Sequence, residues 1–549
     1  MTASSAPSIS SLAEHFAPQR QGGPMSTPFW ITATPPATHG ELHIGHLAGP
    51  YVAADVLSRY LRAEGESVLF TTGTADHTSS VHVRALRTGR KPEEVAEGYR
   101  AAIAADWLRS GIEFDHVVRP RRDRGYGPWV SELFQRLHAE GVIAARTRLL
   151  PYCEPCERWL YGAHVTGSCP HCGAVSEGGM CHECARPNDG GDLVRPSCVL
   201  CATPALPRRC RRLYLPLEPF RDTLADYWAA TGLPPRLAAL CESLVEDGLP
   251  DVAVSHPARW GLPVPVDGFP EHRIDGCFEA AAMHLFGYGD DRALPERTIH
   301  FCGFGHAFCH AVLLPVLLLA RGIKLPQEFC VNESYVIEDR AITCGSDHQV
   351  WALDLLTEYG SDTLRRHVLQ ARPMGRRTVF HADGLGAARR ELDESWNNWL
   401  SRLFTAVRGE SAGLAPAALP GGTGWEVLER RLLRTVEDLR EAYGPDAFDP
   451  RRSVALLDEV VRLVSDFGHV NAHEAGRPTT APGHLPALSA QLAVACALSA
   501  WARPVMPEGA DRLAAALKAE PGRPVSAAAL VPPVPDTRLA PPSGPVFGF

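Results

Sequence analysis

The eight residues His39-Gly40-Glu41-Leu42-His43-Ile44-Gly45-His46 decide how the rest of the chain is interpreted. The apolar residues 28–34 before them predict a buried strand, and residues 47–60 after them have the apolar spacing of a helix. His43 and His46 therefore open a helix directly after a strand and lie on one face of it. A helix start offers free N–H groups and a positive dipole end to a phosphate. The pattern predicts a nucleotide site in which both imidazoles donate hydrogen bonds to phosphoryl oxygens.

A simpler interpretation is that the two histidines are polar residues that only begin a helix. A bare H-x-x-H would favour that interpretation. The strand before the motif, together with Pro35, Pro36 and Gly40 in the turn, favours nucleotide binding instead, because a strand–turn–helix junction is where phosphates are commonly held.

The composition indicates a protein of several domains, with 549 residues, 45% hydrophobic residues and a net charge of −9. The most apolar stretch, residues 311–320, is too short to span a bilayer, and we recognise no signal peptide. We expect a cytoplasmic protein that does not bind membranes. The net charge predicts no general attraction to nucleic acid, although a local RNA-binding face is compatible with it.

The segment 151–212 contains four C-x-x-C pairs. Each pair supplies two thiolates, and two pairs complete a tetrahedral four-thiolate zinc site. The pattern predicts two structural zinc ions and a reducing compartment, since disulfides would consume the same thiols. The alternative, unmetallated free thiols, fits four such pairs poorly. The expected ligands are Cys153, Cys156, Cys169, Cys172, Cys181, Cys184, Cys198 and Cys201.

From about residue 29 to about residue 517 the chain resembles class I aminoacyl-tRNA synthetases, most closely the methionyl enzymes. The resemblance is carried by H-I-G-H-L-A-G-P-Y-V-A-A-D-V-L-S-R-Y at 43–60, the Cys-rich insert, W-G-L-P-V-P at 260–265 and the helical C-terminal third. It implies that ATP with Mg²⁺ activates an amino acid as an aminoacyl adenylate. It also implies that the second and third Cys pairs share one zinc ion and the first and fourth the other. The implied ATP-binding residues are Thr34, His43, Gly45, His46, Gly303 and Val331.

The alternation of short strands and helices predicts an α/β fold with a Rossmann-type parallel sheet, and the C-terminal third predicts a helical bundle. Ligands are expected at the carboxyl ends of the strands. The expected segments are a disordered N-terminus (1–26), the first half of the catalytic domain (27–150), the zinc-knuckle insert (151–212), the second half of the catalytic domain (213–330), a stem segment with the second signature (331–386), the anticodon-binding-like bundle (387–519) and a Pro-rich tail (520–549).

The second signature of the family is altered. Class I synthetases carry a K-M-S-K-S loop whose lysines neutralise the ATP phosphates. The corresponding residues 341–345 read A-I-T-C-G, and the whole chain has only three lysines, Lys91, Lys324 and Lys518. Arg340, directly before this segment, is the candidate for a catalytic positive charge. Losing a pair of charge-assisted phosphate contacts is expected to weaken transition-state stabilisation.

The implied amino-acid pocket is altered as well. Ala75 stands where the family has an acid that binds the substrate's amino group, and Asp76 is its candidate replacement. Smaller or more polar residues replace large aromatic ones. A lone histidine is usually a satisfied core residue, but three at aligned pocket positions favour a functional role. The expected substrate-binding residues are Pro35, Ala37, Asp76, Cys277, Ala280, His284, His306 and His310, and the expected substrate is not methionine.

The RNA-binding end of the resemblance is weakened too. Residues 471–478 lack the Pro-Trp signature with which the family's bundle reads an anticodon. Trp396 and Trp399 either stack on RNA or, as is more common, belong to the core of the bundle. We therefore expect binding of tRNA to be weak or lost.

Three functions remain open. The first choice is a synthetase-like enzyme that transfers the activated amino acid to an acceptor other than tRNA, as in natural-product pathways of the hydrazine-forming type, where the resemblance implies a cupin-type partner enzyme. The second is a methionine–tRNA ligase of translation. The third is a non-catalytic binding or regulatory paralogue. The intact His43 and His46 favour retained nucleotide chemistry, whereas the altered signature and pocket oppose the translation role.

Overall fold

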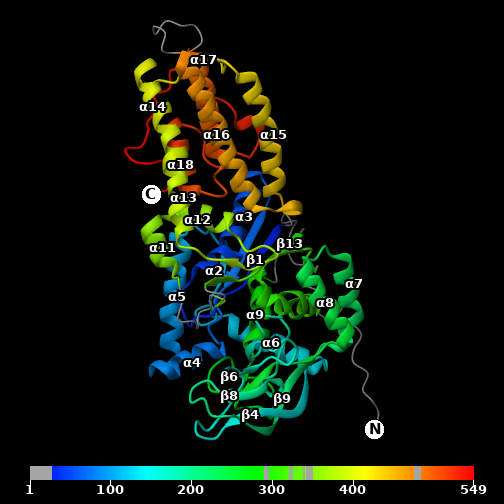
Figure 1. The fold of residues 1–549 in the computed structure, drawn as a ribbon. Helices are drawn as coiled ribbons and strands as arrows, with labels where there is room; N and C mark the ends of the chain where they lie inside the picture. The colour runs from blue at the N-terminus through cyan, green and yellow to red at the C-terminus, as the bar shows by residue number, and fades with distance from the viewer. Residues whose placement is uncertain are drawn as a thin grey trace.

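A parallel sheet occupies the centre of an elongated molecule, with a helical bundle at one end and the Cys-rich insert at the other (Figure 1). The computed structural model describes residues 28–289, 295, 297–320, 325–337, 340–341, 350–474 and 484–548. The expected disordered N-terminus lies outside these residues. The predicted fold class, an α/β protein with a parallel sheet, a Cys-rich insert and a helical C-terminal region, is confirmed.

The central sheet has the strand order β14-β13-β1-β2-β3, and every pairing in it is parallel. Its strands are β1 (Phe29–Ala33), β2 (Val68–Gly73), β3 (His116–Val118), β13 (Arg297–Gly303) and β14 (Glu328–Asn332). All five residues of β1 are buried, as expected for a strand covered on both faces. The carboxyl ends of these parallel strands meet at one edge of the sheet, where ligands bind in folds of this kind.

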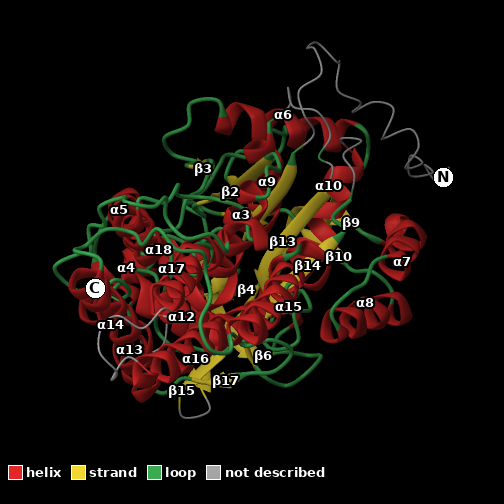
Figure 2. Ribbon diagram, turned by 90° about the horizontal axis from the view of Figure 1, so that it is seen from above, coloured by secondary structure: helices red, strands yellow, loops and turns green. Residues whose placement is uncertain are grey.

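Helices cover both faces of this sheet (Figure 2). Alternate residues of a strand point to opposite faces. Ile31 packs into the core that contains helix α3 (Val52–Ala63), whereas Trp30 packs into the core that contains helix α9 (Gly276–Tyr288). The other helices around the sheet are α4 (Ser79–Thr88), α5 (Pro92–Arg109), α6 (Tyr126–Ala139), α7 (Arg221–Ala230), α8 (Pro235–Asp247) and α10 (Leu314–Ala320).

The helix predicted after the H-I-G-H motif is interrupted. Helix α2 (Ile44–His46) continues into a π-helical turn (Leu47–Tyr51) before α3 begins. Pro50 has no backbone N–H to donate to the preceding turn, and Gly49 has non-helical angles. The buried Arg372 donates hydrogen bonds to the backbone oxygens of Ala48 and Gly49 and thereby satisfies carbonyl groups at the break. The interruption separates the histidine-bearing turn from the long helix behind it.

The Cys-rich insert and the segments that flank it form two antiparallel sheets with the strand orders β10-β9-β4-β5 and β7-β6-β8. A long ribbon of β4 and β9 connects it to the central domain, and Figure 1 shows it at the end of the molecule opposite the bundle. The strands of these two sheets are β4 (Ala144–Cys153), β5 (Arg158–Trp159), β6 (Gly162–Ser168), β7 (Val175–Gly178), β8 (Val194–Cys198), β9 (Leu206–Pro216) and β10 (Asp251–Ala253). A separate pair, β11 (Ser255–Pro257) and β12 (His272–Ile274), follows it.

The C-terminal region is a bundle of helices whose core holds the two tryptophans considered for RNA stacking. Trp396 is 0% exposed and Trp399 is 1% exposed, so both are core residues. Asn397 binds the backbone of Val546 and Phe547, which ties the Pro-rich tail to the bundle. The elements are β15 (Tyr335–Ile337), β16 (Arg340–Ala341), β17 (Thr378–Val379), α11 (Ala352–Tyr359), α12 (Ser361–Gln370), α13 (Asp383–Glu391), α14 (Asn398–Glu410), α15 (Trp425–Tyr443), α16 (Pro450–Glu474), α17 (His484–Trp501) and α18 (Pro507–Leu517).

Helix α17 is long and apolar enough to cross a membrane by length and composition, but 78% of it is buried inside the protein. That burial is typical of the central helix of a bundle. Residues 475–478, at the end of the segment expected to contact an anticodon, lie outside the described residues.

Candidate functional site

The H-I-G-H motif forms an N-terminal cap in which both histidines take part. Nδ1 of His43 accepts a hydrogen bond from the backbone N–H of Gly45 at 3.1 Å, and Nδ1 of His46 accepts one from the backbone N–H of His43 at 3.2 Å. Two amide groups at a helix start, which have no partner inside the helix, are thereby satisfied. A Cβ on residue 45 would lie 3.0 Å from the His43 ring, so only Gly45 fits this arrangement comfortably.

These bonds fix the protonation of both rings. Because each Nδ1 accepts a hydrogen bond, the proton of each neutral imidazole is on Nε2. Burial lowers the pKa of His43 to about 3, with a smaller contribution from His39, and burial lowers the pKa of His46 well below its ordinary value. Both rings are therefore neutral Nε2–H donors at neutral pH. Such donors can stabilise negative charge that develops on a phosphoryl oxygen.

A cavity of about 190 Å³ lies between the carboxyl ends of β1 and β2, helix α9 and the insert. It brings together most of the residues expected to bind substrate, although they come from three separate parts of the sequence. Those in its wall are Pro35, Ala37, Cys277, Ala280, His284, His306 and His310, and Thr34, which was expected to bind ATP, lies there as well.

The remaining predicted residues do not line this cavity. Gly303 ends β13 and Val331 lies in the adjacent β14, at the carboxyl edge of the sheet. His46 is close enough to His306, in the cavity wall, to contribute to its lowered pKa after burial and His182. The start of α2 therefore lies near the side of the cavity that His306 forms. Arg340 belongs to strand β16; its side chain and residues 342–345 lie outside the described part of the chain.

Asp76 lies behind the cavity wall rather than in it. It is 1% exposed, and neither carboxylate oxygen has a hydrogen-bond partner among the described residues. Burial raises the pKa of this carboxyl group to about 6. Its neighbour His77 does line the cavity, although it was not among the residues expected to bind substrate. Nδ1 of His77 lies 2.8 Å from Oε1 of Glu279 on α9, and this carboxylate outweighs burial and raises the pKa of His77.

Three histidines from different elements lie close together at the cavity, where His284 and His310 form part of the wall and His300 contacts His310. His284 bonds to Thr32 at 2.6 Å, His310 bonds to Thr34 at 2.9 Å, and Nδ1 of His300 lies 3.4 Å from Nδ1 of His310. Burial lowers the pKa of His284 to about 4 and lowers the pKa of the other two well below the ordinary value. Neutral imidazoles at this end make the wall polar without adding positive charge.

The insert closes the opposite side of the cavity. Tyr161, Glu177, Met180 and His182 from the insert line it together with Trp260. Sequence reasoning assigned the insert a structural role only and missed these residues. A signal was available in the run Cys181-His182-Glu183-Cys184, where a histidine and an acid stand between two metal ligands. The rings of His182 and His306 lie 5.4 Å apart, which joins the insert to the central domain.

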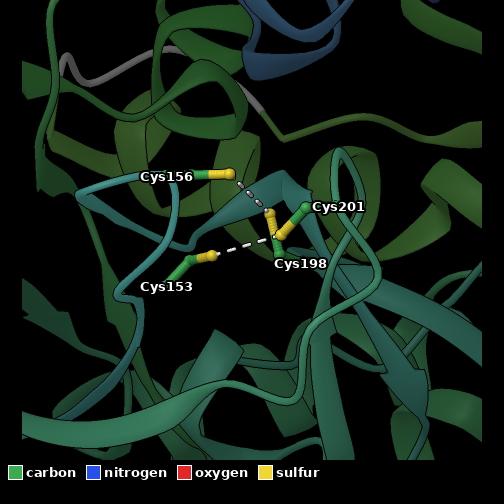
Figure 3. Close-up of side chains that lie close together, drawn as sticks. All are labelled: Cys153, Cys156, Cys198 and Cys201. Carbon is green, nitrogen blue, oxygen red and sulfur yellow. Dashed lines mark hydrogen bonds between the residues drawn. The ribbon is translucent and has the colours of Figure 1, made fainter.

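The eight cysteines form two groups of four, with the first and fourth pairs in one group and the second and third in the other. Within each group the sulfur atoms lie within 4.8 Å of one another. In the first group, Cys153 and Cys201 are 3.4 Å apart and Cys156 and Cys198 are 3.9 Å apart (Figure 3). A tetrahedral site with Zn–S bonds of about 2.3 Å requires S···S distances of about 3.8 Å. Both donor sets therefore fit zinc.

Comparisons with known proteins agree with this architecture. Residues 29–404 match the family model of the class I tRNA synthetases (M). The chain is 29% identical over 401 residues to a methionine–tRNA ligase of Thermomicrobium roseum, covering 69% of this chain and 68% of that protein. It is 27% identical over 446 residues to the methionine–tRNA ligase of Pyrococcus furiosus, covering 76% of this chain and 61% of that protein.

The fold also matches a methionyl-tRNA synthetase of Mycobacterium tuberculosis solved in complex with methionyl-adenylate. The TM-score is 0.78 at 21% identity, over 95% of this chain and 100% of that one. A structure of the same enzyme in its free state gives a TM-score of 0.71 at 20% identity, over 96% and 99% of the two chains. The family match confirms the resemblance drawn from the H-I-G-H motif and the Cys-rich insert: this chain belongs to the class I aminoacyl-tRNA synthetases of the methionyl type.

Proposed function

We propose that this protein activates an amino acid with ATP and passes it to an acceptor other than tRNA. The observation that carries the proposal is the wall of the cavity. Ala37, Cys277 and His284 line it where the family resemblance places large aromatic residues. At these three positions, small or polar side chains supply fewer of the apolar contacts that would select a thioether side chain.

In the activation step the substrate carboxylate attacks the α-phosphorus of ATP, the bond to the bridging oxygen breaks, and pyrophosphate leaves. The Nε2–H groups assigned to His43 and His46 would donate to phosphoryl oxygens as charge develops on them. The backbone at Gly303 and Val331, at the carboxyl edge of the sheet, would hold the nucleotide. Mg²⁺ bound with ATP would neutralise phosphate charge. In the transfer step a nucleophile attacks the carbonyl carbon of the adenylate and AMP leaves.

The second candidate is a methionine–tRNA ligase of translation. It is favoured by the family match and by a fold alignment that includes the helical bundle. The burial of Trp396 and Trp399 removes two aromatic surfaces that could have stacked on RNA. A cupin-type partner enzyme and a cytoplasmic location remain part of the first proposal. Within the described residues we identify no surface that points to a cupin, so that partner is supported by the resemblance alone.

Amino-acid-dependent exchange of pyrophosphate into ATP, across a panel of amino acids, tests the proposal. Exchange with an amino acid other than methionine, without charging of tRNA, is the expected result. Exchange with methionine followed by tRNA charging would overturn the proposal and support the translation role. No exchange with any amino acid, with or without candidate acceptors, would leave a non-catalytic paralogue as the remaining function.

A further inference from the structure

His284 on α9 has one ring nitrogen bonded inside the protein and the other without a partner. Nδ1 lies 2.6 Å from Oγ1 of Thr32 on β1, at the centre of the sheet. Nε2 is buried and has no hydrogen-bond partner among the described residues. The side chain is 3% exposed and forms part of the cavity wall. A buried polar atom without a partner is uncommon in folded proteins, so its position beside a cavity indicates a ligand contact.

The Thr32 hydroxyl determines which ring nitrogen of His284 carries the proton. Thr32 is 0% exposed, and the hydroxyl has no second hydrogen-bond partner in the described part of the chain. If the hydroxyl accepted a proton from Nδ1, its own hydrogen would be buried without an acceptor. Donation from the hydroxyl to Nδ1 satisfies both groups. The ring proton then lies on Nε2, and His284 presents an N–H donor to the cavity.

The surroundings give this donor no acceptor of its own. Ala37 and Ala280 line the same cavity and carry no polar side-chain atoms. The carboxylate of Asp275 already accepts hydrogen bonds from the backbone N–H groups of Cys277 and Phe278 and from the ring of His256. Burial raises the pKa of the Cys277 thiol well above its ordinary value, so no thiolate accepts the bond either. The imidazole itself stays neutral at pH 7, since burial lowers its pKa.

We infer that His284 is a specificity-determining donor of the amino-acid pocket and that the activated amino acid carries an oxygen acceptor in its side chain, as a carboxylate, amide or hydroxyl group. A thioether sulfur is only a weak acceptor, and a hydrocarbon would leave the donor unsatisfied. A site built around a hydrogen bond rejects analogues that lack the partner far more strongly than an apolar pocket rejects a size difference. This inference depends on the proposed amino-acid activation and names its substrate class.

Binding of non-hydrolysable aminoacyl-sulfamoyl-adenosine analogues, measured by calorimetry, tests the inference without requiring turnover. The analogues are compared in pairs of similar size: glutamine with methionine, glutamate with norleucine, and threonine with valine. The wild-type protein is expected to bind the oxygen-bearing member of at least one pair about tenfold or more tightly. The pairs also distinguish the amide, carboxylate and hydroxyl classes.

Three variants identify the residue responsible. His284→Phe keeps a ring but removes the donor, and it should reduce the preference to less than about threefold. Thr32→Val allows the proton to move to Nδ1 and should weaken the preference partly. His381→Phe makes the same change at an exposed histidine and should leave the preference intact.

The result that overturns the inference is tighter binding of the apolar member of every pair by the wild type, or an unchanged preference in His284→Phe. Pyrophosphate exchange with the same amino acids separates this outcome from failure of the proposed function. A preference in binding that depends on His284, without any exchange, would contradict the activation step but support the pocket assignment. Exchange with apolar amino acids alone would support activation and contradict the pocket assignment.

Discussion

The imidazole of His182 lies 5.4 Å from the imidazole of His306 in the wall of the cavity. His182 stands between two cysteines of the second metal group, which consists of Cys169, Cys172, Cys181 and Cys184. A Cβ on residue 305 would meet the backbone of His182 at 3.1 Å, so the insert and the central domain are in close contact here. Glu183, the next residue, pairs with Arg236 and Arg377 outside the insert. A zinc ion held by these cysteines would therefore keep one wall of the cavity in place.

Loss of the second metal group should change the cavity as well as the insert. We expect Cys172→Ser to lower the zinc content from about two ions to about one per chain and the exchange rate by about tenfold or more. Elemental analysis and exchange kinetics on the same preparation measure both effects. His182→Ala should keep both ions yet still raise the KM for the amino acid. Wild-type kinetics in His182→Ala would show that this contact has no role in substrate binding.

The histidine cap should be separable from phosphate binding. His43→Ala removes both functions and should lower the exchange rate at least about tenfold while destabilising the fold by about 1 kcal/mol. His43→Asn places an amide oxygen near the position of Nδ1, so the cap is kept while the Nε2–H donor is lost. We expect His43→Asn to retain the wild-type melting temperature and still lose activity. Full activity in His43→Asn would refute a phosphate contact from this ring. His46→Ala should lower the exchange rate by a similar factor.

Asp76 should impose a cost on stability that depends on pH. Its pKa in the folded protein, about 6, lies above the unfolded value of about 4. As the pH rises from about 4 to about 6, ionisation of Asp76 therefore lowers the free energy of unfolding, and this loss is constant above that range. Asp76→Asn removes this loss. The change that it causes in the free energy of unfolding should therefore be about 2 kcal/mol more favourable at pH 8 than at pH 4. Denaturant titrations at the two pH values measure the difference.

The same variant tests whether Asp76 serves the substrate. If its carboxylate attracts the substrate's ammonium group, Asp76→Asn should raise the KM for the amino acid about tenfold or more at pH 8. A variant that is more stable and has an unchanged KM would remove Asp76 from the list of binding residues. In that case the carboxylate would be a buried group with no substrate role.

A buried ion pair joins the bundle side of the molecule to α3. Oδ2 of Asp55 lies 2.6 Å from Arg365 and 2.8 Å from Arg59, and all three side chains are at most 5% exposed. Burial alone would raise the pKa of Asp55, but the two guanidinium groups outweigh it and lower the pKa below its ordinary value. This stabilisation is therefore complete above about pH 4 and is lost as the pH falls further.

Asp55→Asn should lower the free energy of unfolding by about 3–5 kcal/mol at pH 7, since it leaves buried positive charge without a partner. Chemical denaturation measures the change. The control is Glu132→Gln, which breaks an exposed pair with Arg136 and should cost less than about 1 kcal/mol. An equal effect of the two substitutions would show that the buried pair contributes no more than a surface one.

Local patterns in the sequence predicted much of the fold. The strand at 29–33 follows from a short apolar run, and the strand–turn–helix arrangement around His43 follows from neighbouring residues. The pairing of the Cys-x-x-Cys segments was implied by the family resemblance, and the sulfur atoms group in that way. The break at Leu47–Tyr51 was missed, because the apolar spacing across Pro50 still looks helical and the carbonyl groups at the break are satisfied by a distant residue, Arg372.

The sequence by itself therefore determined the fold class, the strand–turn–helix at His43 and His46, and the four C-x-x-C pairs that gather into two groups, since each of these patterns depends on residues close together in the chain. Only the tertiary structure decided which side chains share the cavity. His77 meets Glu279 across 202 positions, and Thr32 meets His284 across 252. No periodicity records such pairs, because they form where β1, β2, α9 and the insert pack together. The protonation of His284, and with it the expected chemistry of the substrate, is set by that packing.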